Sequence, residues 1–147
     1  MKLALIKHLK TLSDDRMKIA FDAMMAAQAS ANEEGKSSAG DKYETARAMG
    51  QIERDMHARQ YENIKQERAI LDKLNIDLVF ARVGLGALVK TSIGTFFISV
   101  SVGAVQIENQ KILCVSAQSP IGALLVGKNL GDVFSFQEKK VTIEHIC

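Results

Sequence analysis

The amino-acid composition changes sharply near residue 76, and this change constrains the fold more than any other feature of the chain. The residues before it are rich in Ala, Met, Glu, Lys, Arg and Gln, which favour helices. The residues after it are rich in Val, Ile, Phe, Ser and Gly, which are typical of strands and turns. We therefore predict an N-terminal helical domain over residues 1–76 and a small α+β domain over residues 77–147.

The first domain is predicted to be an antiparallel coiled-coil hairpin. Ser13 and the two aspartates after it are interpreted as the N-cap of a long helix. Residues 2–12 are either the root of that helix or a separate amphipathic helix. A polar stretch rich in Gly and Ser interrupts the helical pattern, so we expect the tip of the hairpin at about residues 31–42. A spacing near 3.5 predicts that the seam of the second helix contains Met49, Ile52, Met56, Ile64, Leu71 and Leu74.

The second domain is predicted to be an antiparallel β domain with one short helix. Apolar runs bounded by turn signals predict strands over residues 87–90, 95–100, 111–115, 133–136 and 141–146. The strands around Ile98 and Ile112 are nearly all apolar, which predicts that they are central in the sheet.

The run from Ser119 to Val133 carries closely ordered signals for a helix and its ends. Pro120 suits the first turn of a helix, and Gly127 suits the left-handed residue that ends one. Gly131 supplies a turn before the next apolar run. The apolar face of this short helix is predicted to bury Ile121, Leu124 and Leu125.

Composition argues against several classes of protein. A net charge of +2 is low for a dedicated nucleic-acid binder. No apolar run reaches the length that a membrane span needs, and Lys7, His8 and Lys10 interrupt the N-terminal segment before a secretion signal can form. We expect a cytoplasmic protein that does not bind membranes.

The residues also give little sign of catalysis. We interpret Cys114 as a small buried hydrophobe and Cys147 as a free thiol, with a disulfide or a nucleophile as the alternative. The three histidines have no partner at metal-ligand spacing, and no phosphate-binding loop or catalytic triad can be identified. We expect a protein that is not an enzyme and has no cofactor of its own.

Three segments resemble the Gre (GreA/GreB) transcription elongation factors. The run over residues 119–133 resembles the C-terminal domain of that family, and residues 82–89 resemble the entry into it. Tyr43, Ala46 and Arg47 match the Tyr-x-x-Ala-Arg pattern at the start of the family's second helix. The resemblance implies a coiled-coil hairpin followed by a domain similar to FK506-binding proteins (FKBP-like).

The resemblance also implies a function in transcription elongation. In that family the C-terminal domain binds RNA polymerase at the rim of the secondary channel, and the coiled coil enters the channel, where contact with nascent RNA or DNA is indirect. An Asp-x-x-Glu pair at the tip helps to hold Mg²⁺ for RNA cleavage. Here those positions fall on Lys36 and Ala39, which cannot ligate a cation. We therefore expect regulation without cleavage, although Asp41 and Glu44 keep the spacing one turn later and leave shared Mg²⁺ open.

The candidate site residues follow from this resemblance. The polymerase-binding candidates are Gln118, Ser119 and Pro120. The channel-facing candidates are Glu33, Glu34, Lys36, Asp41, Tyr43, Glu44 and Arg47. The alternative for the acidic members is a solvated loop and ordinary charge at a helix N-terminus.

Two other functions stay open. The hairpin could serve as a coiled-coil adaptor that binds another protein. The β domain could be a prolyl isomerase, but residues 77–147 lack the Trp and Tyr that typically line such a pocket.

Overall fold

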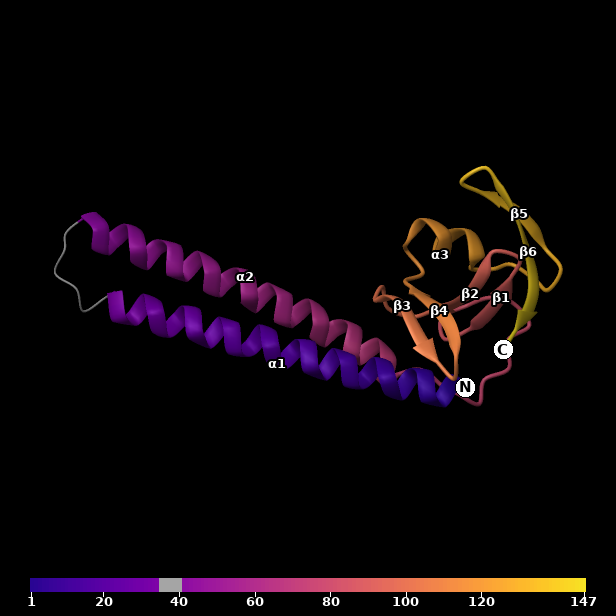
Figure 1. The fold of residues 1–147 in the computed structure, drawn as a ribbon, viewed down its shortest axis with the longest axis horizontal. Helices are drawn as coiled ribbons and strands as arrows, with labels where there is room; N and C mark the ends of the chain where they lie inside the picture. The colour runs from indigo at the N-terminus through magenta and orange to yellow at the C-terminus, as the bar shows by residue number, and fades with distance from the viewer. Residues whose placement is uncertain (35–40) are drawn as a thin grey trace. The chain divides into compact units, whose positions relative to one another are not determined.

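The computed structural model describes residues 1–34 and 41–147, with side chains at residues 1–33 and 44–147 (Figure 1). These residues form two compact units. We call residues 9–69 the hairpin unit, and residues 1–8 together with 70–147 the sheet unit. Helix α1 (Lys2–Glu34) and helix α2 (Asp41–Asp72) each continue from one unit into the other. The domain boundary near residue 76 stays a prediction.

Helix α1 is uninterrupted over 33 residues, so residues 2–12 are the root of this helix. The prediction that Ser13 caps the helix is wrong, because Ser13 lies inside α1 and its side chain is fully buried. The capping signal fails here because Ser13 is buried in the seam of a continuous helix, and such packing stabilises a helix more than local preference does.

The two helices of the hairpin unit pack antiparallel along a seam with a seven-residue repeat. A Cβ built at Gly50 of α2 would lie 2.9 Å from the Cβ of Ala31 in α1. The centres of the Phe21 and Tyr61 rings are 5.8 Å apart. The buried or half-buried seam positions of α1 and α2 recur in steps of seven as Ser13, Ala20 and Ala27, and as Gly50, His57 and Ile64.

The predicted seam of α2 is correct in its period but partly wrong in its phase. Ile64 and Leu71 are buried as predicted, and Leu74 is half-buried. Met49, Ile52 and Met56, however, are exposed. Steps of seven back from Ile64 lead to His57 and Gly50. Gly50 and the small seam residues of α1 let the helices approach closely. The larger side chains therefore lie outside the seam.

The sheet unit confirms the predicted α+β class of a helical hairpin followed by a mostly antiparallel sheet with one short helix. The strands lie in the order β3-β4-β2-β1-β6-β5, and β2 pairs with β4 in parallel while the other described neighbours pair antiparallel. The strands around Ile98 and Ile112 lie inside the sheet as predicted. The elements are β1 (Leu88–Thr91), β2 (Gly94–Ile98), β3 (Gly103–Ile107), β4 (Gln110–Val115), α3 (Pro120–Leu125), β5 (Val133–Phe136) and β6 (Lys139–Ile146).

Strand β3 was not predicted. Its sequence contains Gly103, Ala104 and Gln106, which have weak strand preference. It forms because Glu108 and Asn109, both with positive φ, make a two-residue turn that pairs β3 with β4. Gln110 already belongs to β4, so the turn consists of these two residues alone.

Helix α3 covers one face of the sheet, where the apolar core of the sheet unit lies (Figure 1). Ile121 and Leu125 are buried as predicted, but Leu124 is 38% exposed. Six residues make less than two turns, so α3 presents too narrow a face to bury all three. The core consists of Val83, Ala87, Val89, Phe96, Ile98, Ile121, Leu125 and Ile143.

Candidate partner-binding site

The corner between β4 and α3 is organised by the hydroxyl group of Ser119. Its Oγ accepts a hydrogen bond from the N–H of Gly122 at 3.1 Å, so Ser119 is the N-cap of α3. The same Oγ donates to the carbonyl oxygen of Ser116 at 2.7 Å. Pro120 occupies the start of the helix as predicted. The Ser119 side chain is therefore committed to holding the corner together.

Gly122 fixes the same corner by its lack of a side chain. A Cβ at this position would overlap the backbone carbonyl oxygen of Ser116. The sequence reasoning missed both Ser116 and Gly122. Their signal was present as a serine three residues before Ser119 and a glycine inside a short helix, where glycine is otherwise unfavourable.

Two segments that are far apart in the chain meet beside α3. The N–H of Val83 donates to the carbonyl oxygen of Lys128 at 2.9 Å. The carbonyl oxygen of Val83 accepts a hydrogen bond from the N–H of Gly127 at 2.8 Å. Arg82 also forms an isolated bridge with Asn129. Residues 82–89 and 119–133, which carry the sequence resemblance, thus form one connected piece of structure.

The end of this piece contains the two predicted glycine turns. Gly127 and Gly131 have φ of +88° and +86°, which side-chain-bearing residues rarely adopt. The side chain of Asp132 accepts a hydrogen bond from the N–H of Asn129 at 2.8 Å. The ammonium group of Lys128 lies 5.8 Å from the centre of the Phe134 ring. The turns thereby connect α3 to β5 in a defined geometry.

The three polymerase-binding candidates differ in exposure. Gln118 and Pro120 are exposed, whereas Ser119 is half-buried. A partner at this corner would therefore contact the Gln118 amide and the Pro120 ring, and Ser119 would position both. Their binding role stays a prediction.

Six of the seven channel-facing candidates lie near the ends of α1 and α2. Glu33, Glu44 and Arg47 are exposed, and Arg47 has an interaction partner. Glu34, Asp41 and Tyr43 lie in the helices, but their side chains are outside the described residues. Lys36 is also outside the described residues. Within residues 1–34 and 41–147, no group of three or more His, Cys, Asp or Glu is placed to hold a metal ion.

A groove of about 460 Å³ runs along one side of the hairpin unit. Ile19, Ala20 and Ala23 line it from α1. Arg16 and Glu67 form an ion pair of 3.6 Å at its margin. The sequence reasoning missed this groove, and its signal was the alanine residues spaced along one side of α1. From α2 the groove is lined by His57, Gln60, Asn63, Ile64 and Glu67.

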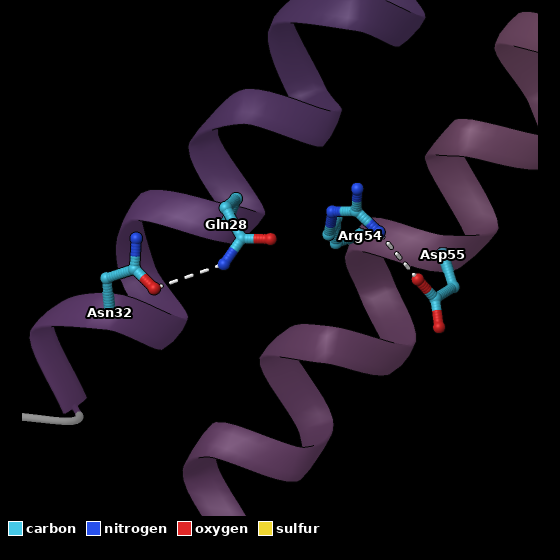
Figure 2. Close-up of polar contacts among 4 residues, drawn as sticks. All are labelled: Gln28, Asn32, Arg54 and Asp55. Carbon is cyan, nitrogen blue, oxygen red and sulfur yellow. Dashed lines mark hydrogen bonds and ion pairs between the residues drawn. The ribbon is translucent and has the colours of Figure 1, made fainter.

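The far half of the hairpin unit carries polar contacts within single helices. Figure 2 shows Gln28 Nε2 donating to Asn32 Oδ1 at 3.1 Å in α1, and an Arg54 N–H donating to Asp55 Oδ1 at 3.0 Å in α2. The cross-helix pair of Arg68 and Asp14, at 2.9 Å, lies nearer to the sheet-unit ends of the helices.

The two cysteine thiols have different environments, as predicted. Cys114 is buried in β4, and burial raises the pKa of its thiol to about 12. Cys147 is exposed and is not in a disulfide. Near Cys147 the Lys2 ammonium lies 4.8 Å from the centre of the Phe80 ring, and its pKa is lowered by burial. These groups line a cavity of about 290 Å³ in the sheet unit.

Among the described residues, no helix is both long enough and apolar enough to cross a bilayer.

Comparison with known proteins gives a limited result. No protein-family model and no curated protein sequence matches the chain. Among solved structures, the chain is similar to the transcription factor Gfh1 with 14% sequence identity and a TM-score of 0.37, covering 93% of this chain and 92% of that chain.

Proposed function

We propose that the chain is a non-catalytic regulator of transcription elongation that binds RNA polymerase near its secondary channel. The sheet unit supplies the binding surface, and the end of the hairpin at residues 31–42 reaches into the channel. Contact with nascent RNA or DNA is indirect, and such a factor works in the cytoplasm. One observation carries the proposal: residues 82–89 and 119–133, which resemble the Gre family separately, are joined by the hydrogen bonds of Val83.

The α3 corner supports a role in binding rather than catalysis. Gln118 and Pro120 are exposed on a corner that Ser119 and Gly122 hold in one conformation. A preorganised corner loses little conformational entropy when a partner binds. The amide of Gln118 can exchange hydrogen bonds with a partner but adds no charge.

The proposal does not include RNA cleavage. Lys36 stands where the family has an aspartate, and an ammonium group repels Mg²⁺. Asp41 and Glu44 lie one helical turn apart in α2, so shared Mg²⁺ at these two residues is the alternative to be tested.

Binding is tested with purified core RNA polymerase and the full chain carrying a fluorescent label on Cys147. We expect saturable binding that Gln118→Ala and Pro120→Ala weaken about tenfold each, as for residues at an interface hot spot. Gln106→Ala is the matched control, since Gln106 is an exposed glutamine on β3. Absence of binding by the unsubstituted chain would overturn the proposal.

Cleavage is tested on stalled elongation complexes that contain backtracked RNA. We expect the chain to change the elongation rate without accelerating RNA cleavage at any Mg²⁺ concentration. Acceleration that is lost in Asp41→Asn or Glu44→Gln would instead assign a shared Mg²⁺ to these residues.

A coiled-coil adaptor is the second candidate function, and the groove on the hairpin unit favours it. Replacement of residues 33–44 by a neutral linker separates the two functions. A channel factor would keep polymerase binding and lose its effect on elongation, whereas an adaptor that binds along the helices would be unaffected.

A further inference from the structure

One side of the hairpin unit has a groove in one half and exposed methionine side chains in the other. Ile19 and Asn63 line the groove. Steps of seven from Asn63 lead to Met56 and Met49, and one step of seven from Ile19 leads to Ala26, so these residues share the side of the coiled coil on which the groove lies. We call this side the groove face.

The two halves of the groove face have opposite shapes. In the half nearer residues 9 and 69, Ala20 and Ala23 leave the groove between Ile19 and Asn63. In the other half, Met49 is 60% exposed and Met56 is 41% exposed, beside the small Ala26. Methionine side chains are flexible and fill irregular apolar gaps well.

We propose that the groove face binds a second copy of this chain in an antiparallel, two-fold arrangement. In this dimer Met49 and Met56 of each copy enter the groove of the other. The centre of the groove and the centre of the methionine pair are about ten residues apart along α2, or about 15 Å. A two-fold axis midway between them, near His57, places each pair of methionines over the other copy's groove.

The occupant is a second copy because the hollow and the protruding residues are on the same face and side by side. A different helix could fill the groove, but it would leave the two methionines exposed. A second copy covers both at once. The charged pair of Arg16 and Glu67 is already formed within each copy, and Gln60 shares a hydrogen bond of 2.9 Å with His57.

The contact is small. The face extends over about 17 residues of α1, or about 25 Å. Interfaces of this size belong to the weak and transient class, so the expected dissociation constant is in the micromolar range. Association would cover helix surface between residues 16 and 67, and it does not depend on any role in transcription.

The mass of the full chain is measured by sedimentation velocity from about 1 to 200 μM, a range chosen to span a micromolar dissociation constant. We expect a reversible monomer–dimer equilibrium for the unsubstituted chain. The double variant Met49→Gln with Met56→Gln is expected to weaken dimerisation at least tenfold. Met25→Gln is the matched control, since Met25 is 51% exposed and lies seven residues after Lys18, which lines a cavity on the other side of the hairpin. Circular dichroism verifies that each variant keeps its helices.

A second measurement tests the orientation. Tyr61 of α2 lies beside Phe21 of α1. Because the helices are antiparallel, moving back along α2 from Tyr61 to His57 corresponds to moving forward along α1 from Phe21 by a similar distance. The two-fold axis near His57 therefore passes α1 near Ala26. In a Cys147→Ser background, Ala26→Cys is expected to give dimers with a short bismaleimide linker, whereas Met25→Cys gives few. A monomeric mass at all concentrations, equal loss of dimer in Met25→Gln, or equal crosslinking at both positions would overturn the proposal.

Discussion

The hairpin unit and the sheet unit bury different kinds of side chain. The seam of the hairpin contains Ser13, Ala20 and Ala27, whereas the sheet buries large residues such as Phe97 and Ile98 completely. Alanine removes little apolar area from water, so the hairpin depends on its length and on close helix approach. The stability of the sheet unit depends instead on close packing of its large buried side chains. The same chain therefore contains two units that should fail in different ways.

This difference can be measured because each unit has its own probe. The Cys114 thiol, with its raised pKa and full burial, reacts with alkylating reagents only when the sheet unit opens. Hydrogen exchange in residues 13–33 and 44–64 reports opening of the hairpin unit. A Cys147→Ser background removes the exposed thiol from the first measurement.

The largest effect is expected in the sheet unit for Gly122→Ala. The added methyl group overlaps the carbonyl oxygen of Ser116, so the corner and α3 must move, at a cost of about 4 kcal/mol in the free energy of unfolding. Urea denaturation and Cys114 alkylation measure this loss. The control is Gly103→Ala, which meets no atom within 4 Å but has a φ of +81°, and should cost about 1 kcal/mol. Equal costs for the two variants would contradict the account of the corner.

A smaller and local effect is expected in the hairpin unit for Gly50→Leu. The larger side chain meets Ala31, which already lies within 2.9 Å of a Cβ at this position, and separates the helices at a cost of about 2 kcal/mol. Hydrogen exchange should accelerate in the hairpin while Cys114 alkylation stays slow. The exposed Met25→Leu, on the other side of the hairpin unit, serves as the control and should change neither. Faster alkylation of Cys114 would show that the two units do not open separately.

Each unit contains a buried hydroxyl without a hydrogen-bond partner, and removing it tests the two environments against each other. Ser13→Ala is expected to increase the free energy of unfolding by about 1 kcal/mol, because it relieves an unsatisfied group and improves helix propensity. Ser99→Ala removes the buried hydroxyl without a partner in the sheet unit. Its gain should be smaller, because Ser99 lies outside a helix and alanine adds no helix propensity there. Thermal denaturation measures the stability of both variants against that of Ser30→Ala, a control at an exposed serine of α1. Destabilisation by Ser13→Ala would mean that its hydroxyl is satisfied in solution.

The smallest effect is expected for the cross-helix ion pair of the hairpin unit. Asp14→Asn weakens the ion pair with Arg68 and should cost about 0.5 kcal/mol, because the pair is partly exposed to water. The difference should shrink in 1 M salt, where the Debye length is about 3 Å. The control is Asp22→Asn, an exposed aspartate of the same helix. A loss of several kcal/mol that salt does not change would contradict the view that the seam holds the hairpin.

Local signals were sufficient where a residue's own backbone preference decides the structure. Pro120 begins α3, Gly127 and Gly131 adopt positive φ, and the apolar runs became strands close to their predicted bounds. The candidate corner at Gln118, Ser119 and Pro120 was instead chosen from the resemblance to the Gre family, and the structure shows that Ser119 is the N-cap of α3. A glycine inside a short helix marked Gly122 as unusual, but its role could not be predicted because it depends on the position of the carbonyl group of Ser116.

The sequence by itself determined that this chain has a helical half and a strand-rich half, and where its sharpest turns lie, because propensity and turn chemistry act within a few residues. Only the tertiary structure decided that the hairpin seam follows Gly50 and His57 rather than Met49 and Met56, that β2 and β4 run parallel, and that Val83 joins the α3 segment. These features are contacts between residues distant in the chain. Their outcome depends on which side chains allow the closest packing, and no single segment contains that information.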